Sequence, residues 1–199
     1  MKNLPMARAL RTARTACPAA ACAIALLLAL GAAAGAPAAS AAQAATVRRQ
    51  TILVLPFDLY DFSLDRRAQT VVPLHHWAAA LAGQMAGKLR HDSALRVLSD
   101  STSIAALRKV RINYSHPTAC RRCMISVARH AGARLVVIGQ VHKLSNLITY
   151  FNVEIVDVHT GRVVHEINMR ADGADTNSMW RHIAQNLADS VDRAIAHTH

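Results

Sequence analysis

The N-terminal segment most constrains what this chain can fold into, because it has the pattern of an export leader. Four basic residues precede an apolar run over residues 19–34, and the first 45 residues contain no acidic side chain. The most apolar stretch, residues 23–30, is shorter than the roughly 20 apolar residues needed to span a bilayer. We therefore predict that residues 1–44 are a cleaved signal peptide and that no transmembrane segment remains after cleavage.

The position of small residues places the predicted cleavage site. Small-x-small patterns at 39–41 and 42–44 predict a mature N-terminus between residues 42 and 45, whereas an uncleaved membrane anchor is the alternative. Cys17 and Cys22 lie before or inside the apolar core, which argues against a lipid-modified cysteine. We expect residues 45–199 to form a single α/β domain in the periplasm of a Gram-negative cell envelope.

The charge of the chain is strongly positive, but part of it belongs to the leader. The formal net charge is +11, and removing the four basic residues of the leader leaves about +7, which we expect to be spread along the chain. In a cytosolic protein such an excess would indicate nucleic acid as a partner. Export argues against nucleic acid and favours a basic solvated surface that contacts anionic lipid headgroups or an acidic partner.

The hydrophobic pattern after the leader predicts an α/β fold. An apolar run at 51–57 is typical of a central strand buried on both faces, and the polar residues 58–67 are expected to form an extended loop. Apolar residues spaced by four predict helices, and Gly132 suits a helix C-cap. The expected elements are a strand at 51–57, a helix along 77–90, a strand at 95–98, helices around 104–110 and at 120–131, a strand at 133–141, a hairpin within 147–169 and a helix from 176 to 196.

The hairpin decides the kind of sheet. Phe151, Val153 and Ile155 alternate with polar residues, and a turn is expected at 159–161, which predicts antiparallel strands with one face on the core. The strand at 133–141 is expected to lie beside the first strand. The prediction is therefore a mixed parallel and antiparallel sheet with packed helices, in the order β-α-β-α-α-β-β-β-α.

Cys120 and Cys123 are the only cysteines after the leader. In an oxidising compartment such a pair is most simply a structural disulfide, and residues three apart can bridge within the first helical turn. A redox-active pair is a second hypothesis, because a helix N-terminus beside two arginines favours a thiolate. Against it, a thioredoxin-like protein places this motif directly after a central strand, whereas here it follows a polar loop that contains Pro117.

The same segment contains residue types that bind metals and haem. His116 and His130 flank the two cysteines and would complete a set of four zinc ligands, but the spacings are unusual for zinc and thiols oxidise in this compartment. Covalent haem attachment requires a histidine directly after the second cysteine, and that position is Met124. We therefore predict no metal site and no cofactor.

Two carboxylates follow the first strand. Asp58 and Asp61 lie where α/β sheets place ligands, at the carboxyl end of a central strand, so a binding crevice lined by them is a hypothesis beside simple loop solvation. The sequence has no glycine-rich phosphate loop, no nucleophile elbow and no His-Glu-x-x-His helix. We predict no catalytic residue, and an enzyme that acts through carboxylates around Asp58 is the rival interpretation.

A set of motifs lies along the mature chain, at residues 55–58, Asp61, 63–64, Cys120, Cys123, 131–133, 139–148 and Trp180. Together they resemble those of a family of uncharacterised secreted bacterial proteins that carry a domain of unknown function, often encoded beside quinoprotein dehydrogenase genes. The family has no established activity to carry over. More remotely, the strand order and residues 54–57 resemble the N-terminal domain of the periplasmic translocation protein TolB and the periplasmic part of curli secretion channels, domains that serve protein contacts.

The leading functional hypothesis is a non-enzymatic periplasmic accessory protein that binds another envelope protein or a small ligand. In this hypothesis Cys120 and Cys123 form a structural disulfide. The first rival is a thiol-disulfide or metal-handling protein that uses the same pair.

Overall fold

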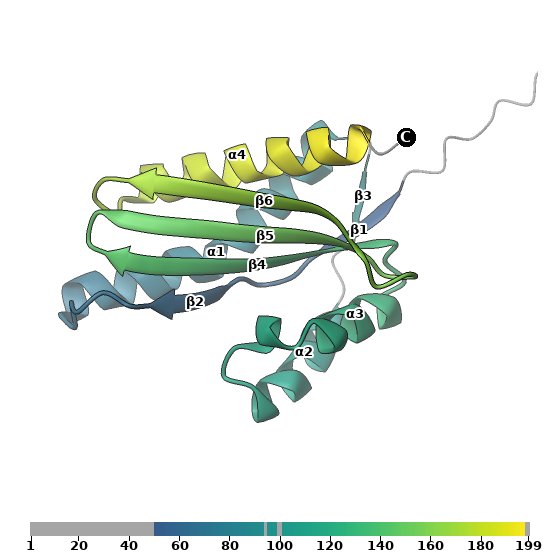
Figure 1. Cartoon of the computed structure of the whole chain (residues 1–199), viewed down its shortest axis with the longest axis horizontal. Helices are drawn as coiled ribbons and strands as arrows, with labels where there is room; N and C mark the ends of the chain where they lie inside the picture. The colour runs from purple at the N-terminus through teal and green to yellow at the C-terminus, as the bar shows by residue number, and fades with distance from the viewer. Residues whose placement is uncertain (1–49, 94, 99–100, 198–199) are drawn as a thin grey trace, which may run out of the picture. The chain divides into compact units, whose positions relative to one another are not determined.

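A computed structural model describes residues 50–93, 95–98 and 101–197 of the chain. The predicted signal peptide, residues 1–44, lies outside these described residues and stays a prediction. The described elements are β1 Thr51–Val54, β2 Asp58–Asp61, α1 Ala68–Asp92, β3 Arg96–Leu98, α2 Ser101–Asn113, the 3-10 helix η1 Pro117–Ala119, α3 Arg121–His130, β4 Leu135–Ser145, β5 Ile148–Asp157, β6 Val163–Asp172 and α4 Asn177–Ala196 (Figure 1).

Six strands form one mixed sheet in the described part of the chain, with the order β3-β1-β4-β5-β6. β1 pairs in parallel with β3 and with the first residues of β4, and β2 pairs in parallel with the second half of β4. β4, β5 and β6 form an antiparallel meander. The predicted mixed sheet is confirmed, including the place of the first strand beside the strand that begins at Leu135.

Two hydrophobic clusters lie on opposite faces of the sheet. The larger cluster joins the sheet to α1 and α4, and it includes the predicted helical stripe of Leu81, Met85 and Leu89. The smaller cluster joins β1, β4 and β5 to α2 and α3, with Met124 fully buried at its centre. In Figure 1, α1 and α4 lie behind the antiparallel strands, whereas α2 and α3 lie near one end of the sheet.

Close packing at Gly139 lets β1 and β2 share one edge of β4. Between the two strands the chain passes through Leu55, whose N–H donates to Val137 O at 3.1 Å, and then through Pro56, which has no N–H to donate. The next side chain, Phe57, is 5% exposed and lies against Gly139. A Cβ on Gly139 would overlap the Phe57 ring, so this position of β4 requires glycine.

The structure confirms the predicted order of elements and adds one strand. Residues 58–67 were expected to be a loop, but Asp58–Asp61 form β2. Four residues of alternating character between turns carry too little hydrophobic pattern to indicate a strand, and it is the pairing with β4 that fixes them. Gly132 has a φ of 74° directly after the third helix, which confirms its predicted role at the helix end.

No helix among the described residues combines the length and apolar character that crossing a membrane requires.

A buried ion pair closes the far end of the sheet. Lys143 on β4 is fully buried, and its Nζ bonds to Asp175 Oδ2, which lies just before α4. The backbone of Lys143 also accepts a hydrogen bond from Phe62 N–H at 2.8 Å, which continues the pairing of β2 with β4. Through its side chain and its backbone, Lys143 therefore joins β4 to the segment before α4 and to the end of β2.

Substituting Gly139 tests the close packing. We expect Gly139→Ala to lower the free energy of unfolding by about 1–3 kcal/mol, because the added methyl group must displace the Phe57 ring. Gly87→Ala is the matched control: it lies inside α1 with nothing within 4 Å of its added Cβ, so it should raise stability by about 0.5–1 kcal/mol. Urea unfolding measures both, and equal effects of the two substitutions would contradict the packing argument.

Breaking the buried ion pair should be costly. We expect Lys143→Met to lower the free energy of unfolding by about 3–5 kcal/mol, because it leaves the Asp175 carboxylate buried without its cation. Adding Asp175→Leu to this variant should restore most of the loss. Lys88→Met, which removes the partly exposed pair with Asp189, should cost at most about 1 kcal/mol. Thermal and urea unfolding check these values, and no recovery in the double variant would rule out this cause.

Candidate interaction surface

Cys120 and Cys123 are joined by a disulfide, as the sequence predicts, with a Cα–Cα distance of 5.2 Å. Cys120 is the N-cap of α3, and its sulfur lies 3.3 Å from the backbone nitrogen of Cys123. Cys123 packs against the smaller hydrophobic cluster, next to the fully buried Met124. The disulfide therefore fixes the first turn of α3 where that helix meets the core.

Asp58 holds the segment before the disulfide against the sheet. The side chain is 5% exposed, and Oδ2 accepts a hydrogen bond from the backbone N–H of Thr118 at 2.7 Å. Oδ1 lies 3.8 Å from a guanidinium nitrogen of Arg111 on α2. Thr118 in turn accepts a hydrogen bond from Gln140 on β4 at 3.2 Å. This carboxylate thus links β2 to α2 and to η1.

Asp61 does not face the same side of the sheet as Asp58. The two residues are three apart on one strand, so their side chains point to opposite faces. Asp61 Oδ1 accepts hydrogen bonds from the backbone N–H of Ser63 at 2.9 Å and from its hydroxyl at 2.6 Å, and Oδ2 contacts Arg66. The structure therefore does not bring the two predicted carboxylates together in one crevice, and a ligand-binding role for either stays a prediction.

Part of the sheet face on the α2 and α3 side has no helix over it. The smaller cluster covers only the start of β4 and the end of β5. Beyond it, the strand register aligns polar and aromatic side chains in rows that cross several strands. One row is Tyr60, His142, Tyr150 and Arg170. The next begins at Asp58, which η1 and α2 cover, and continues through Gln140 to Asn152 and Asn168, and Glu154 pairs with Glu166 beyond them. We call this the open sheet face.

Aromatic rings gather at one end of the open sheet face. Tyr60 stacks on His142 with a centroid distance of 4.9 Å and on His116 at 4.1 Å. Burial lowers the pKa of His142, so the imidazole is neutral at pH 7. Next in the row, Tyr150 lies under the guanidinium of Arg170, 5.8 Å from the ring centroid. These rings make the surface of the open sheet face partly apolar, and apolar surface forms no hydrogen bonds with water.

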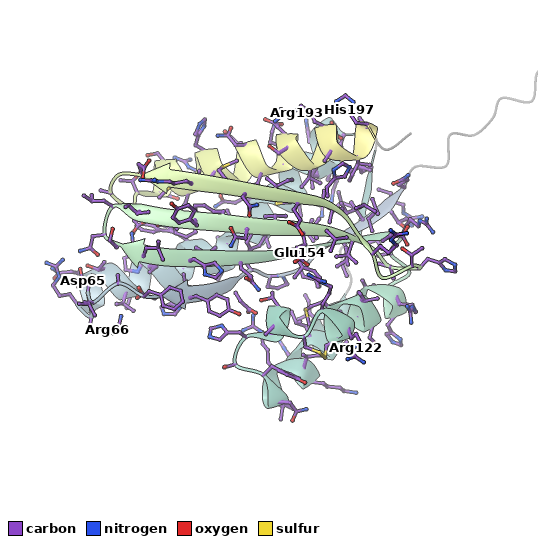
Figure 2. All side chains as sticks on the ribbon, viewed as in Figure 1. Asp65, Arg66, Arg122, Glu154, Arg193 and His197 are labelled. Atoms are coloured by element: carbon purple, nitrogen blue, oxygen red, sulfur yellow. A yellow bond between two sulfur atoms is a disulfide. The ribbon has the colours of Figure 1, made fainter. Side chains whose placement is uncertain are left out.

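A small cavity of about 380 Å³ lies where the open sheet face meets α3. Thr118, Gln140 and Asn152 contribute polar groups to its wall. The Arg121 guanidinium forms a two-point ion pair with Glu154 at 2.6 and 2.8 Å, which raises the pKa of Arg121 (Figure 2 labels Glu154). The cavity thus combines amide, hydroxyl and charged groups beside the first residue of α3.

The sequence hypotheses of a metal site receive no support from the geometry. No group of three or more His, Cys, Asp and Glu residues that could hold a metal ion occurs in the described residues. The Sγ atoms of Cys120 and Cys123 are bonded to each other, and His116 stacks on Tyr60.

The rows of the open sheet face cannot be predicted from the sequence, because cross-strand register decides which residues share a row.

Comparison with known proteins identifies a family and a set of similar folds. A family model described as "Protein of unknown function (DUF2380)" matches residues 50–190. Among curated proteins, no sequence matches this chain.

Three solved structures of low sequence identity share features of the fold. Escherichia coli LpoB is 15% identical, with a TM-score of 0.46 over 62% of this chain, and the match spans only 56% of the LpoB chain. Lipoprotein GNA1162 from Neisseria meningitidis is 14% identical, with a TM-score of 0.44 over 73% of this chain and 96% of that one. TolB from Acinetobacter baumannii, also 14% identical, has a TM-score of 0.42 over 74% of this chain and 28% of its own. These likenesses concern the fold alone.

Removing the disulfide tests its structural role. We expect the Cys120→Ser/Cys123→Ser variant to fold but to lose about 2 kcal/mol of unfolding free energy, the value for closing so short a loop. Reductant should destabilise the original protein by a similar amount and leave the double variant unchanged. Urea unfolding with and without reductant measures both effects, and equal stability of all four samples would contradict the structural role.

Proposed function

The chain belongs to the DUF3280 family, whose description is "Protein of unknown function (DUF2380)". From the geometry above we propose that it is a non-enzymatic accessory protein of the periplasm that binds another envelope protein. The observation that carries the proposal is the open sheet face. It presents aromatic, amide and charged side chains from β4, β5 and β6, and none of the described helices lies over them. Tyr60 and Arg170 stand at the two ends of one row, and tyrosine and arginine are enriched where proteins bind one another.

The partner surface that we propose is rigid before binding. β4 and β5 are paired over ten residue pairs, and β5 and β6 over nine. The side chains of the Tyr60 row are ordered by stacking, and Gln140 is held by bonds to Thr118 and His142. A preorganised surface loses little side-chain entropy when a partner binds, which favours affinity.

The environment of the polar groups supports a binding role more than catalysis. Asp58 is engaged by Thr118 and Arg111, and the Cys120–Cys123 disulfide packs at the start of a helix on the core. Both groups that the sequence marks for chemistry therefore have structural partners. We propose, in line with the predicted signal peptide at residues 1–44, that the domain works in the periplasm, where this disulfide is stable.

A small polar ligand is the second candidate, and the cavity beside α3 favours it. Its wall carries the Thr118 hydroxyl, the amides of Gln140 and Asn152, and the Arg121–Glu154 pair. Its volume of about 380 Å³ falls within the range of small-molecule sites. In this version the ligand occupies one end of the open sheet face and the protein partner is absent.

Crosslinking in living cells tests the proposed partner surface. A photo-reactive amino acid at Asn168, which is exposed on β6, should give a covalent adduct with one envelope protein. The same residue at Gln185, exposed on α4, should give none. Tyr150→Ala should weaken the association by about 2 kcal/mol, or roughly 30-fold, if the ring lies in the centre of the contact.

Adduct formation at both positions, or at neither, would contradict the proposal. In the second case, ligand screening by thermal shift would decide for the small-molecule alternative. In that screen, Asn152→Leu should abolish the stabilisation that a bound ligand gives. Asn168→Leu should not, because Asn168 lies outside the cavity wall.

A further inference from the structure

The net positive charge of the domain is concentrated in one helical layer. Residues 101–134, which contain α2, η1 and α3, hold seven Lys and Arg residues and no Asp or Glu. The remainder of residues 45–199 holds twelve basic and twelve acidic residues, so its net charge is zero. The whole excess of about +7 therefore belongs to this segment, contrary to the expectation that it is spread along the chain.

Only some of these cations have carboxylate partners. Arg121 pairs with Glu154, Arg134 pairs with Asp157, and Arg111 lies 3.8 Å from Asp58. These three arginines face the sheet, and carboxylates of the domain largely neutralise their charge.

The remaining cations of the layer lie on its outer side. Arg108, Lys109 and Arg122 are exposed, and the described part of the chain offers them no carboxylate within ion-pair distance. Arg129 is also exposed and donates only to the backbone oxygen of Val158. Figure 2 shows Arg122 on this layer, on the opposite side of the molecule from Arg193 on α4.

Apolar side chains stand among these cations. Ile112 is 82% exposed, Ile104 is 54% exposed and Tyr114 is 43% exposed, all on α2 or directly after it. Between α2 and α3 lies a groove of about 940 Å³ whose floor includes Ala106, Val110 and Val127 and whose rim is basic. Together with the apolar floor of the groove, these side chains give the basic layer an apolar component.

We propose that the outer side of α2 and α3 docks on the surface of a bilayer that contains anionic lipids. Basic residues interleaved with exposed aliphatic and aromatic side chains are the composition of interfacial membrane-binding helices. Lys and Arg at such a surface each contribute about 1 kcal/mol of attraction, and the layer has no acidic side chain to oppose it. This inference goes beyond the proposed protein partner and does not depend on it.

The position of the apolar residues favours a membrane over an acidic protein helix. A helix bound in the α2–α3 groove would contact the small residues of its floor. The exposed apolar residues of this layer, Ile104, Ile112 and Tyr114, are not among those that line the groove. A broad, deformable surface reaches the groove rim and these residues together.

Vesicle binding tests the proposal. The protein and all its variants are purified after export from the cell, so that they share the same N-terminus. We expect sedimentation with vesicles of phosphatidylcholine mixed with phosphatidylglycerol, no sedimentation with phosphatidylcholine alone, and release by high salt. Arg108→Gln/Arg122→Gln should weaken binding about 30-fold, since each charge is worth about fivefold. Ile112→Ser should weaken it further.

The control is Arg181→Gln/Arg193→Gln, which removes the same charge from α4 and should leave binding unchanged. Circular dichroism verifies that each variant is folded. An equal loss in the α4 control would overturn the proposal, because it would show that net charge and not this layer determines binding. Absence of binding to the phosphatidylglycerol vesicles would also overturn it, as would a soluble acidic helical peptide that binds the layer when vesicles do not.

Discussion

The hydrogen-bonded pairing of β4 along both of its edges is the interaction on which the rest of this domain depends. One edge holds β1 and then β2, and the other holds β5. Both faces of β4 are covered near its start, and successive residues contribute to different clusters. Val136 belongs to the smaller hydrophobic cluster and Val137 to the larger one. Its glycine receives the Phe57 ring and its lysine pairs with Asp175, so one strand organises the core, the strand edges and the attachment of α4.

The sequence predicts the elements of this fold well, because most of them carry a strong hydrophobic pattern. The stripe on α1 and the alternation of β5 each repeat over several turns or residue pairs, and tertiary packing merely completes them. β2 is different: Asp58–Asp61 contains only four residues, two of them acidic, and its extended form comes from pairing with β4. A strand whose stability is supplied entirely by a partner leaves little trace in its own residues.

The candidate surfaces could be predicted only in part. Cys120 and Cys123 were identified from chemistry that is local in the sequence, and the disulfide follows. The row from Tyr60 to Arg170 joins four strands, so it exists only once their register is known. By contrast, the basic layer has a plain sequence signal, the absence of any acid over residues 101–134, which an average over the whole chain conceals.

The proposed membrane-binding side of α2 and α3 and the open sheet face are separated by about the thickness of one helix, so binding at one would limit what can bind at the other. α2 and α3 pack with their inner side on β1, β4 and β5, and their outer side carries the unpaired cations. A helical layer is about 10 Å thick, so docking of its outer side would hold the uncovered part of the same sheet face roughly that far from the lipid headgroups. A partner that binds Tyr150 and Asn168 in this gap would have to present a thin segment close to the bilayer. If both proposals hold, membrane docking would favour the membrane-proximal part of an envelope protein as the partner.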